Sequence, residues 1–228
     1  MYKYLLFDLD DTLLDFKAAE AASVRRVFKE FNIDSSDKTV SVYSNINKRF
    51  WERFERGEIE RDEIFEGRFK ELSLVIGVSF DTKAVCRRYF ENLSNCGFTF
   101  DGAEELLKLL KGKYVLCAAT NGALITQKKR IELSGLEKYF DGGIFISEEI
   151  GCKKPGKEFF DYILSSLKNP PKNQVLVLGD SLSSDILGAV NSGLDSCFVN
   201  LRNTENNTSL KPTYTVTDLS QIPAVCGL

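Results

Sequence analysis

Four apolar runs of the sequence end in side chains that could do chemistry. The runs are "YLLFDLD", "YVLCAATNG", "GIFIS" and "QVLVLGDSLSSD". The polar groups at or just after their ends come from Asp8, Asp10, Thr120, Asn121, Gly122, Lys153, Lys154, Asp180 and Asp185. In open parallel sheets, ligands bind at the carboxyl ends of the strands. If the runs are neighbouring strands, these groups converge on one crevice.

The predicted cluster holds up to four carboxylates, one hydroxyl and one or two ammonium groups. Carboxylates that crowd together become protonated unless a cation compensates them. Oxygen ligands suit Mg²⁺, which keeps positions for water and for substrate phosphate. A carboxylate beside Mg²⁺ can attack phosphorus and form an aspartyl-phosphate, while a second carboxylate moves the proton. The hydroxyl, the N–H groups of "TNG" and the lysine would hold the phosphoryl oxygens.

The composition excludes several other chemistries. The chain has no histidine, so Ser-His-Asp and Cys-His catalysis and histidine-ligated metals are excluded. Its 33 acidic and 30 basic residues give a net charge of -3, which provides no general basic field for a nucleic acid polymer. Any anionic ligand must therefore be held at a local site, and the polar cluster suits a small phosphorylated metabolite as the partner. We expect the chain to be a monomer or weak homo-oligomer.

The sequence also bears on membrane association, cellular location and the state of the cysteines. The N-terminal "MYKYLLFDLD" is charged, and no apolar run reaches the roughly 18 residues of a membrane span. We expect no membrane association and a cytoplasmic location. The six cysteines contain no CxxC pair, so we expect them to be reduced and mostly packed in the interior.

The segments that must position the cluster show two different hydrophobic patterns. From Lys17 to about Asn95, apolar residues recur at three- and four-residue spacing, which predicts a bundle of about four helices. After Gly97, short apolar runs alternate with amphipathic segments, which predicts a mostly parallel sheet covered by helices on both faces. The predicted organisation is a Rossmann-like α/β core, residues 1–14 and 98–228, with a helical domain, residues 15–97, inserted after the first strand.

The motifs "FDLDDTLLD", "AATNG", "KKP" and "LGDSLSSD", in this order, resemble the four motifs of the haloacid dehalogenase superfamily. The resemblance spans the chain and implies a phosphatase, because dehalogenase members lack the second aspartate of the first motif. It implies that Asp8 is the nucleophile and Asp10 the general acid/base. It also implies phosphate binding by Thr120 and charge neutralisation by Lys154, the lysine that precedes proline.

The same resemblance implies a metal site and a cap. The Mg²⁺ ligands would be Asp8, Asp180 and the backbone carbonyl of Asp10, with Asp185 in support. The insert resembles an α-helical cap that closes over small substrates. "FERGEIERDEIFEGRF" and the stretch from "TNGALITQKKR" to "FFDYIL" are similar to a bacterial subgroup that includes pyrimidine 5'-nucleotidases.

The substrate is therefore expected to be a 5'-nucleoside monophosphate, pyrimidine above purine. Sugar phosphates, pyrophosphate and a phosphomutase reaction on the same scaffold remain alternatives, as does a binding module without catalysis. The intact set of carboxylates argues against the last, since a binder would not need both Asp8 and Asp10.

Several residues also have a structural interpretation. Asp11 is interpreted as structural or solvated, and Lys153 as solvated. Thr120 and Asn121 could form a helix N-cap, and Asp185 could simply open the following helix. In the insert, Phe50, Trp51 and Phe54 have the spacing of core residues, although they could also offer a flat base a stacking surface. The insert's arginines are expected to be solvated unless one reaches the substrate; they are Arg49, Arg53, Arg56 and Arg68.

Overall fold

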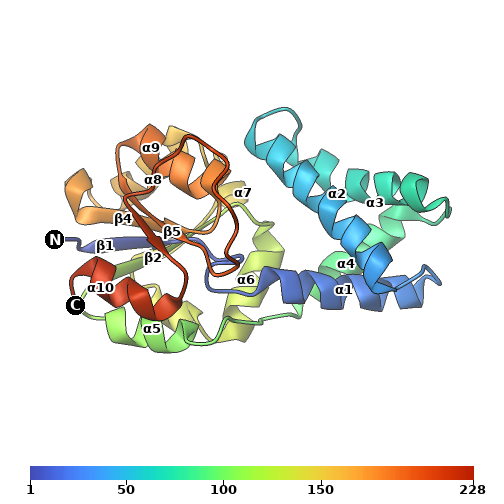
Figure 1. The fold of residues 1–228 in the computed structure, drawn as a ribbon, viewed down its shortest axis with the longest axis horizontal. Coiled ribbons are helices and arrows are strands. Elements are labelled where there is room, and N and C mark those ends of the chain that lie inside the picture. Colours follow the sequence, from blue (N-terminus) through green and yellow to red (C-terminus); the bar gives the residue numbers. More distant parts are fainter. The chain divides into compact units, whose positions relative to one another are not determined.

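The structure is a computed structural model that describes residues 1–228. The chain divides into two compact units (Figure 1). The α/β unit consists of Met1–Asp15 and Phe98–Leu228, and the helical unit consists of Phe16–Gly97.

The α/β unit is built on a six-stranded sheet in which all neighbouring strands are parallel. In spatial order the strands are β3 (Gly143–Ile146), β2 (Val115–Thr120), β1 (Tyr4–Phe7), β4 (Val175–Gly179), β5 (Asp195–Val199) and β6 (Tyr214–Val216). Strand β1 lies between β2 and β4, and the strand order reverses at this point. A reversal of this kind opens a crevice at the carboxyl ends of the strands.

Helices cover both faces of the sheet, because successive strand residues point to opposite faces. Leu5 and Phe7 belong to one apolar cluster, with residues of α5 (Ala103–Leu110) and α10 (Ile222–Cys226). Leu6 belongs to a second cluster, with residues of α8 (Lys157–Ser166) and α9 (Leu187–Ser192). Figure 1 shows these helix pairs on opposite sides of the sheet. The predicted α/β fold class is confirmed.

The remaining elements of this unit are short apart from one helix. They are α6 (Leu124–Ser134), α7 (Ser147–Ile150), and helical turns at Glu137–Tyr139, Lys172–Gln174, Leu182–Ile186 and Leu219–Gln221. Strand β6 was not predicted from the sequence. It has only three residues, two of them exposed, and it follows a polar loop at the edge of the sheet, so its apolar signal is weak.

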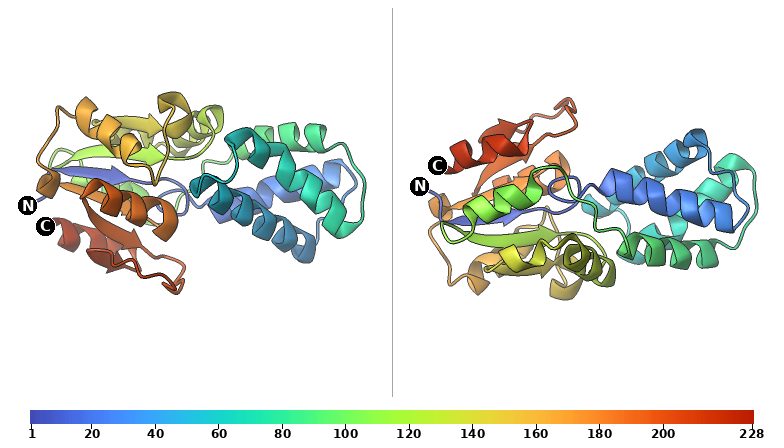
Figure 2. Two further views of the ribbon diagram at one scale, coloured as in Figure 1. Left: turned by 90° about the horizontal axis from the view of Figure 1, so that it is seen from above. Right: turned by 90° about the horizontal axis from the view of Figure 1, so that it is seen from below.

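The helical unit contains four helices, α1 (Phe16–Glu30), α2 (Asp37–Glu55), α3 (Arg61–Ile76) and α4 (Thr82–Ser94). Figure 2 shows them packed alongside one another. Side chains fix where the helices begin: Ser36 accepts from the Thr39 N–H at the start of α2, and Asp81 accepts from the Ala84 N–H at the start of α4. Helix α3 ends at Gly77, whose φ of 67° is favourable for glycine.

The helical unit has its own apolar core, to which Phe50 and Phe54 contribute. The expectation that Arg68 is solvated is wrong, because only 2% of this residue is exposed. Its guanidinium lies 4.7 Å from the Tyr89 ring centroid and 5.1 Å from that of Phe90. Sequence spacing could not reveal this, because burial of an arginine requires partners from several helices at once.

The structure also describes the cysteines and the lengths of the helices. All six cysteines are free thiols; Cys86, Cys117, Cys197 and Cys226 are buried, and Cys96 and Cys152 are partly buried. No helix is both long enough and apolar enough to cross a lipid bilayer.

Candidate active site

Three carboxylates meet at the carboxyl ends of β1 and β4. The Asp8 N–H donates to the Leu178 carbonyl at 2.8 Å, so Asp8 is still held beside β4 where β1 ends. Asp180 follows the last residue of β4 directly, and Asp185 lies in the helical turn Leu182–Ile186. Carboxylate oxygens of Asp8, Asp180 and Asp185 all lie within 4.8 Å of one another. The structure therefore brings together three of the carboxylates that the sequence placed at strand ends.

Lys154 is the buried cation of this cluster. Its Nζ donates to Asp8 Oδ1 at 2.6 Å, to Asp185 Oδ1 at 2.6 Å and to the Ala119 carbonyl at 2.7 Å. An ammonium group has three N–H donors, so protein oxygens engage all of them. Lys153 is partly exposed to solvent. Of the two lysines, Lys154 is the one that contacts the carboxylates.

Asn121 fixes the loop that carries Lys154. Its Nδ2 donates to the Lys154 carbonyl at 2.9 Å, and the Lys154 N–H donates to Asn121 Oδ1 at 3.0 Å. Both polar ends of the buried amide side chain therefore hold the backbone on either side of Lys154. Asn121 is not a helix N-cap, because α6 begins at Leu124 after Ala123.

Burial and like charges shift the pKa values of the cluster. Burial, with the Asp185 and Asp10 charges, raises the pKa of Asp8 to about 8 against the opposing effect of Lys154. Burial and the neighbouring Asp8 and Asp185 raise the pKa of Asp180 well above its usual range. Burial alone would lower the pKa of Lys154, but Asp185 and Asp8 more than offset this and raise it. The cluster therefore favours a further cation.

Thr120, at the end of β2, presents a hydroxyl whose lone pairs are occupied. Its Oγ1 accepts from the Gly122 N–H at 3.1 Å and from Gln127 Nε2 at 2.9 Å. A hydroxyl has one donor and two acceptor sites. The O–H of Thr120 can therefore still donate a hydrogen bond to a ligand oxygen.

Asp10 is held by two residues that the sequence analysis did not single out. Arg130 Nη1 donates to Asp10 Oδ1 at 2.5 Å, and Gln127 Nε2 donates to Asp10 Oδ2 at 3.0 Å. Both residues are buried on α6, three positions apart and so on one helix face. The available signal was this spacing on the helix that follows "TNG".

Asp185 is buried, and each of its carboxylate oxygens accepts a hydrogen bond. Besides accepting from Lys154, it accepts from the Ser181 N–H at 3.1 Å. A Cβ at Gly179 would lie 2.2 Å from Asp185 Cγ, so only glycine at the end of β4 leaves room for this carboxylate. The interpretation that Asp185 simply opens a helix does not account for these contacts.

Asp11 has a structural partner within the α/β unit. It adopts φ 57° just after Asp10, and its Oδ1 accepts from Arg202 Nη2 at 2.7 Å. The same Nη2 donates to Asp15 Oδ1 at 2.6 Å. These contacts agree with the structural interpretation of Asp11.

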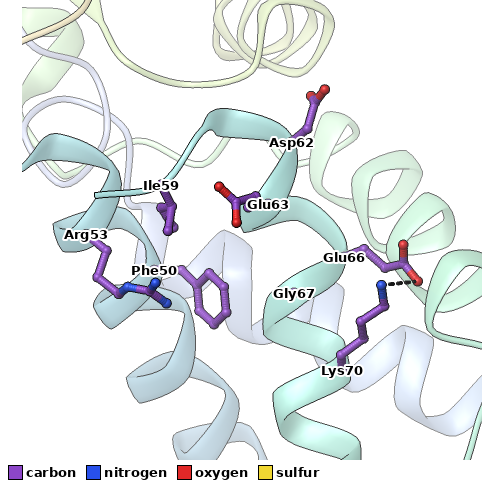
Figure 3. Close-up of a pocket in the computed structure, with 8 residues that line it drawn as sticks. All are labelled: Phe50, Arg53, Ile59, Asp62, Glu63, Glu66, Gly67 and Lys70. Carbon is purple, nitrogen blue, oxygen red and sulfur yellow. Dashed lines mark ion pairs between the residues drawn. The ribbon is translucent and has the colours of Figure 1, made fainter. Parts of the chain in front are cut away.

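The helical unit has an open pocket of about 250 Å³ between α2 and α3 (Figure 3). Its lining includes Phe50 and Arg53, whose guanidinium lies 5.6 Å from the Phe50 ring centroid. A Cβ at Gly67 would lie 2.7 Å from Phe50 Cε1, so glycine allows the ring to pack against α3. Three carboxylates also line the pocket, those of Asp62, Glu63 and Glu66. The pocket that contains Phe50 and Arg53 is therefore lined by acidic groups as well.

Comparison with known proteins identifies the family. The family model for haloacid dehalogenase-like hydrolases matches residues 2–193. The chain belongs to this family. The haloacid dehalogenase-like chain is similar to pyrimidine 5'-nucleotidase PynA of Streptococcus pneumoniae, with 38% identity over 94% of this chain and 91% of that protein. It is also similar to pyrimidine 5'-nucleotidase YjjG of Escherichia coli, with 31% identity over 97% of this chain and 96% of that protein.

A solved structure agrees with this assignment. The magnesium-bound crystal structure of the HAD-hydrolase YfnB from Bacillus subtilis has a TM-score of 0.94 and 36% identity. The match covers 100% of this chain and 99% of that one. The predicted family membership is confirmed, and the protein is an enzyme, a phosphatase of the haloacid dehalogenase type.

Proposed function

We propose that this enzyme is a Mg²⁺-dependent phosphomonoesterase that hydrolyses 5'-nucleoside monophosphates through an aspartyl-phosphate on Asp8. The supporting observation is the placement of Asp8, buried at the carboxyl end of the central strand and in contact with the Lys154 ammonium at 2.6 Å. The Lys154 ammonium together with a bound Mg²⁺ would keep this buried carboxylate ionised and fixed in place, so that it can approach phosphorus with little reorganisation.

In the proposed first step, an Asp8 oxygen forms a bond to phosphorus as the bond from phosphorus to the ester oxygen breaks. Asp10, in its protonated form, gives its proton to the departing oxygen, so the alcohol leaves neutral. In the second step, Asp10 takes a proton from water, whose oxygen attacks the phosphorus of the aspartyl-phosphate. Asp8 is released as a carboxylate together with inorganic phosphate, and Asp10 is protonated for the next cycle.

The phosphoryl oxygens would be held by the Thr120 hydroxyl. Lys154 would chiefly neutralise Asp8, since its three donors are engaged by protein oxygens. Asn121 and Gly122 shape the loop around these groups. That they also contact the phosphoryl group stays a prediction.

The residues fit a Mg²⁺ ion. Their oxygen-only donors lie within 4.8 Å of one another, and burial and like charge raise the pKa values of Asp8 and Asp180. Asp8 and Asp180 would hold the ion with the backbone carbonyl of Asp10, and Asp185 would support them. When bound, Mg²⁺ supplies positive charge to the nucleophile and to the phosphoryl oxygens. The presence of magnesium in the YfnB crystal structure supports this assignment.

The substrate class rests on the relatives. PynA and YjjG are named pyrimidine 5'-nucleotidases and cover nearly the whole chain. We propose the same preference, pyrimidine above purine, with selectivity supplied by the helical unit as a cap.

A screen of phosphate release tests the proposal. With Mg²⁺ present, kcat/KM should be higher for pyrimidine nucleoside monophosphates than for purine nucleotides, hexose phosphates and pyrophosphate. Asp8→Asn should lower activity by at least about a thousandfold. Asp161→Asn serves as a matched control, since the Asp161 side chain is 45% exposed and pairs with Lys157 on the surface of α8. EDTA should abolish activity until Mg²⁺ is restored.

Two results would contradict different parts of the proposal. Normal turnover by Asp8→Asn would rule out the nucleophile, whereas a preference for a hexose phosphate would overturn only the substrate class. An acid-quenched reaction should also leave a radiolabelled phosphoryl group on the peptide that contains Asp8.

A further inference from the structure

A buried network connects α6 to the two groups that the proposed reaction uses for proton transfer and phosphate binding. Arg130 is fully buried, and its Nη1 reaches both Asp10 Oδ1 at 2.5 Å and Gln127 Oε1 at 2.8 Å. Gln127 is also buried, and its Nε2 donates to Asp10 Oδ2 at 3.0 Å and to Thr120 Oγ1 at 2.9 Å. Each oxygen of Asp10 therefore has its own donor.

The direction of the hydrogen bonds follows from Arg130. A guanidinium can only donate, so Gln127 must turn its amide oxygen toward Arg130. Its NH₂ group then faces Asp10 and Thr120. Because that NH₂ donates to Thr120 Oγ1, the Thr120 O–H is directed elsewhere. One arginine thus sets the orientation of the amide, the carboxylate and the hydroxyl.

We propose that Arg130 and Gln127 are positioning residues, which hold the Asp10 carboxylate toward the leaving oxygen and keep the Thr120 O–H available to the phosphoryl group. The inference rests on the proposed role of Asp10 as general acid/base. Burying a guanidinium is unfavourable unless hydrogen bonds replace its lost contacts with water. If position 130 only had to fill space between α6 and the sheet, an apolar side chain would do so without this cost.

Leaving-group dependence separates positioning from packing. Gln127→Met keeps the length of the side chain but has no N–H donor, and Arg130→Lys keeps the charge but loses the planar fork. Both should lower kcat/KM about 10- to 100-fold for phenyl phosphate or a nucleoside monophosphate, whose leaving oxygen needs a proton. The loss should be clearly smaller for p-nitrophenyl phosphate. Lys129→Met, an exposed neighbour on α6, is the matched control.

A double-mutant cycle with Asp10→Asn makes the test specific. If Arg130 and Gln127 act through Asp10, their variants should add little to the leaving-group effect of Asp10→Asn. Thermal unfolding of each variant checks that it folds, and the milder Gln127→Met carries the test if an Arg130 variant does not.

The outcomes distinguish this inference from the proposed function. If Asp10→Asn itself shows no leaving-group dependence, the role of Asp10 fails and the inference fails with it. If Asp10→Asn shows the dependence but folded Gln127→Met and Arg130→Lys lose equal activity on all esters, or their leaving-group effects add to that of Asp10→Asn, the positioning of Asp10 is overturned while its role as general acid/base stands.

Discussion

At the scale of single residues, the carboxylates of Asp8, Asp180 and Asp185 share one ammonium neighbour, Lys154, which donates to two of them. Such a cluster is organised for ligand binding at a cost to its own stability, because buried like charges repel. Two predictions follow from the crowding.

The first concerns pH and Asp8 in metal-free protein. The folded-state pKa of Asp8 is about 8, whereas an unfolded chain has about 3.9. Between these values the folded protein retains a proton that the unfolded chain has lost. Asp8 should therefore lower the free energy of unfolding as pH rises from about 4 to about 8, by at most about 1.4 kcal/mol per pH unit for this one group.

Urea unfolding in EDTA at several pH values measures this slope. Asp8→Asn should make this slope smaller and should be more stable than the parent at pH 8, and Mg²⁺ should reduce the difference. A parent protein whose metal-free stability rises over this pH range would show that Asp8 is ionised in the cluster without a metal.

The second prediction concerns the space beside Asp185. In Gly179→Ala the new Cβ would lie 2.2 Å from Asp185 Cγ, so Asp185 must move and Lys154 loses one partner. We expect activity to fall at least about tenfold and the free energy of unfolding to fall by about 1–3 kcal/mol. Steady-state kinetics and urea unfolding test this. Unchanged kinetics would mean that the loop after β4 can shift without disturbing the Lys154–Asp185 pair.

Some of the candidate site residues could be predicted from the sequence and others could not. Asp8, Asp10, Thr120, Asp180 and Asp185 could be expected at one site because each lies at or just after the end of an apolar run, and parallel strands bring such positions to one edge. Position alone left Lys153 and Lys154 as alternatives, and only the resemblance of "KKP" to the family motif selected Lys154. Gln127 and Arg130 could not be found this way. On a helix a polar residue is usually solvated, and whether it is buried depends on how the helix lies against the sheet.

At the scale of elements, the core strands were the predictable part. Each central strand is a continuous apolar run, because it is buried on both faces. The helical unit was predictable in outline from its periodicity, but its interior was not. Arg68 Nη1 donates to Asn47 Oδ1 at 2.6 Å, and Asn47 in turn donates to Glu20 at 2.6 Å, so the interior contains a chain of polar contacts across α1, α2 and α3.

Arg68→Met tests the contribution of this arginine. The variant removes the contacts with the rings of Tyr89 and Phe90 and leaves Asn47 Oδ1 without its donor. We expect the helical unit to lose about 2–4 kcal/mol of unfolding free energy. Exposed Arg87→Met on α4 should change it by less than about 0.5 kcal/mol.

The chain has one tryptophan, Trp51 in α2, so its fluorescence follows unfolding of the helical unit specifically. If the Arg68→Met midpoint matches that of Arg87→Met, the buried guanidinium contributes no net stability.

At the scale of the whole molecule, the two units have separate apolar cores, and no residue of the helical core belongs to either cluster that covers the sheet. The chain leaves and re-enters the α/β unit through a short antiparallel ladder. The Asp15 N–H donates to the Phe98 carbonyl at 3.0 Å, and the Phe100 N–H donates to the Leu13 carbonyl at 3.0 Å. A change in hydrophobic spacing along the sequence led us to predict an insert, whereas the ladder has no signature in the sequence.

Excision of the helical unit tests this independence. Joining Asp15 to Phe98 by an Asn-Gly turn suits the ladder, since such turns connect adjacent antiparallel strands. We expect the α/β unit to unfold cooperatively and to hydrolyse p-nitrophenyl phosphate at a reduced rate, without discrimination among nucleotides. Circular dichroism and kinetics measure both. An unfolded product would show that the α/β unit depends on its insert.

The ladder at residues 13–15 and 98–100 has a consequence for how such chains can diversify. Both of its strands belong to the host, so any inserted segment is attached at two points one hydrogen bond apart. Folding of the α/β unit already holds the two attachment points side by side, so the entropy cost of bringing them together does not fall on the insert. The entropy cost of closing a loop also grows only slowly with the length of the insert. Recombination at this junction can therefore exchange one insert for another while the strand ends that carry the chemistry are inherited intact.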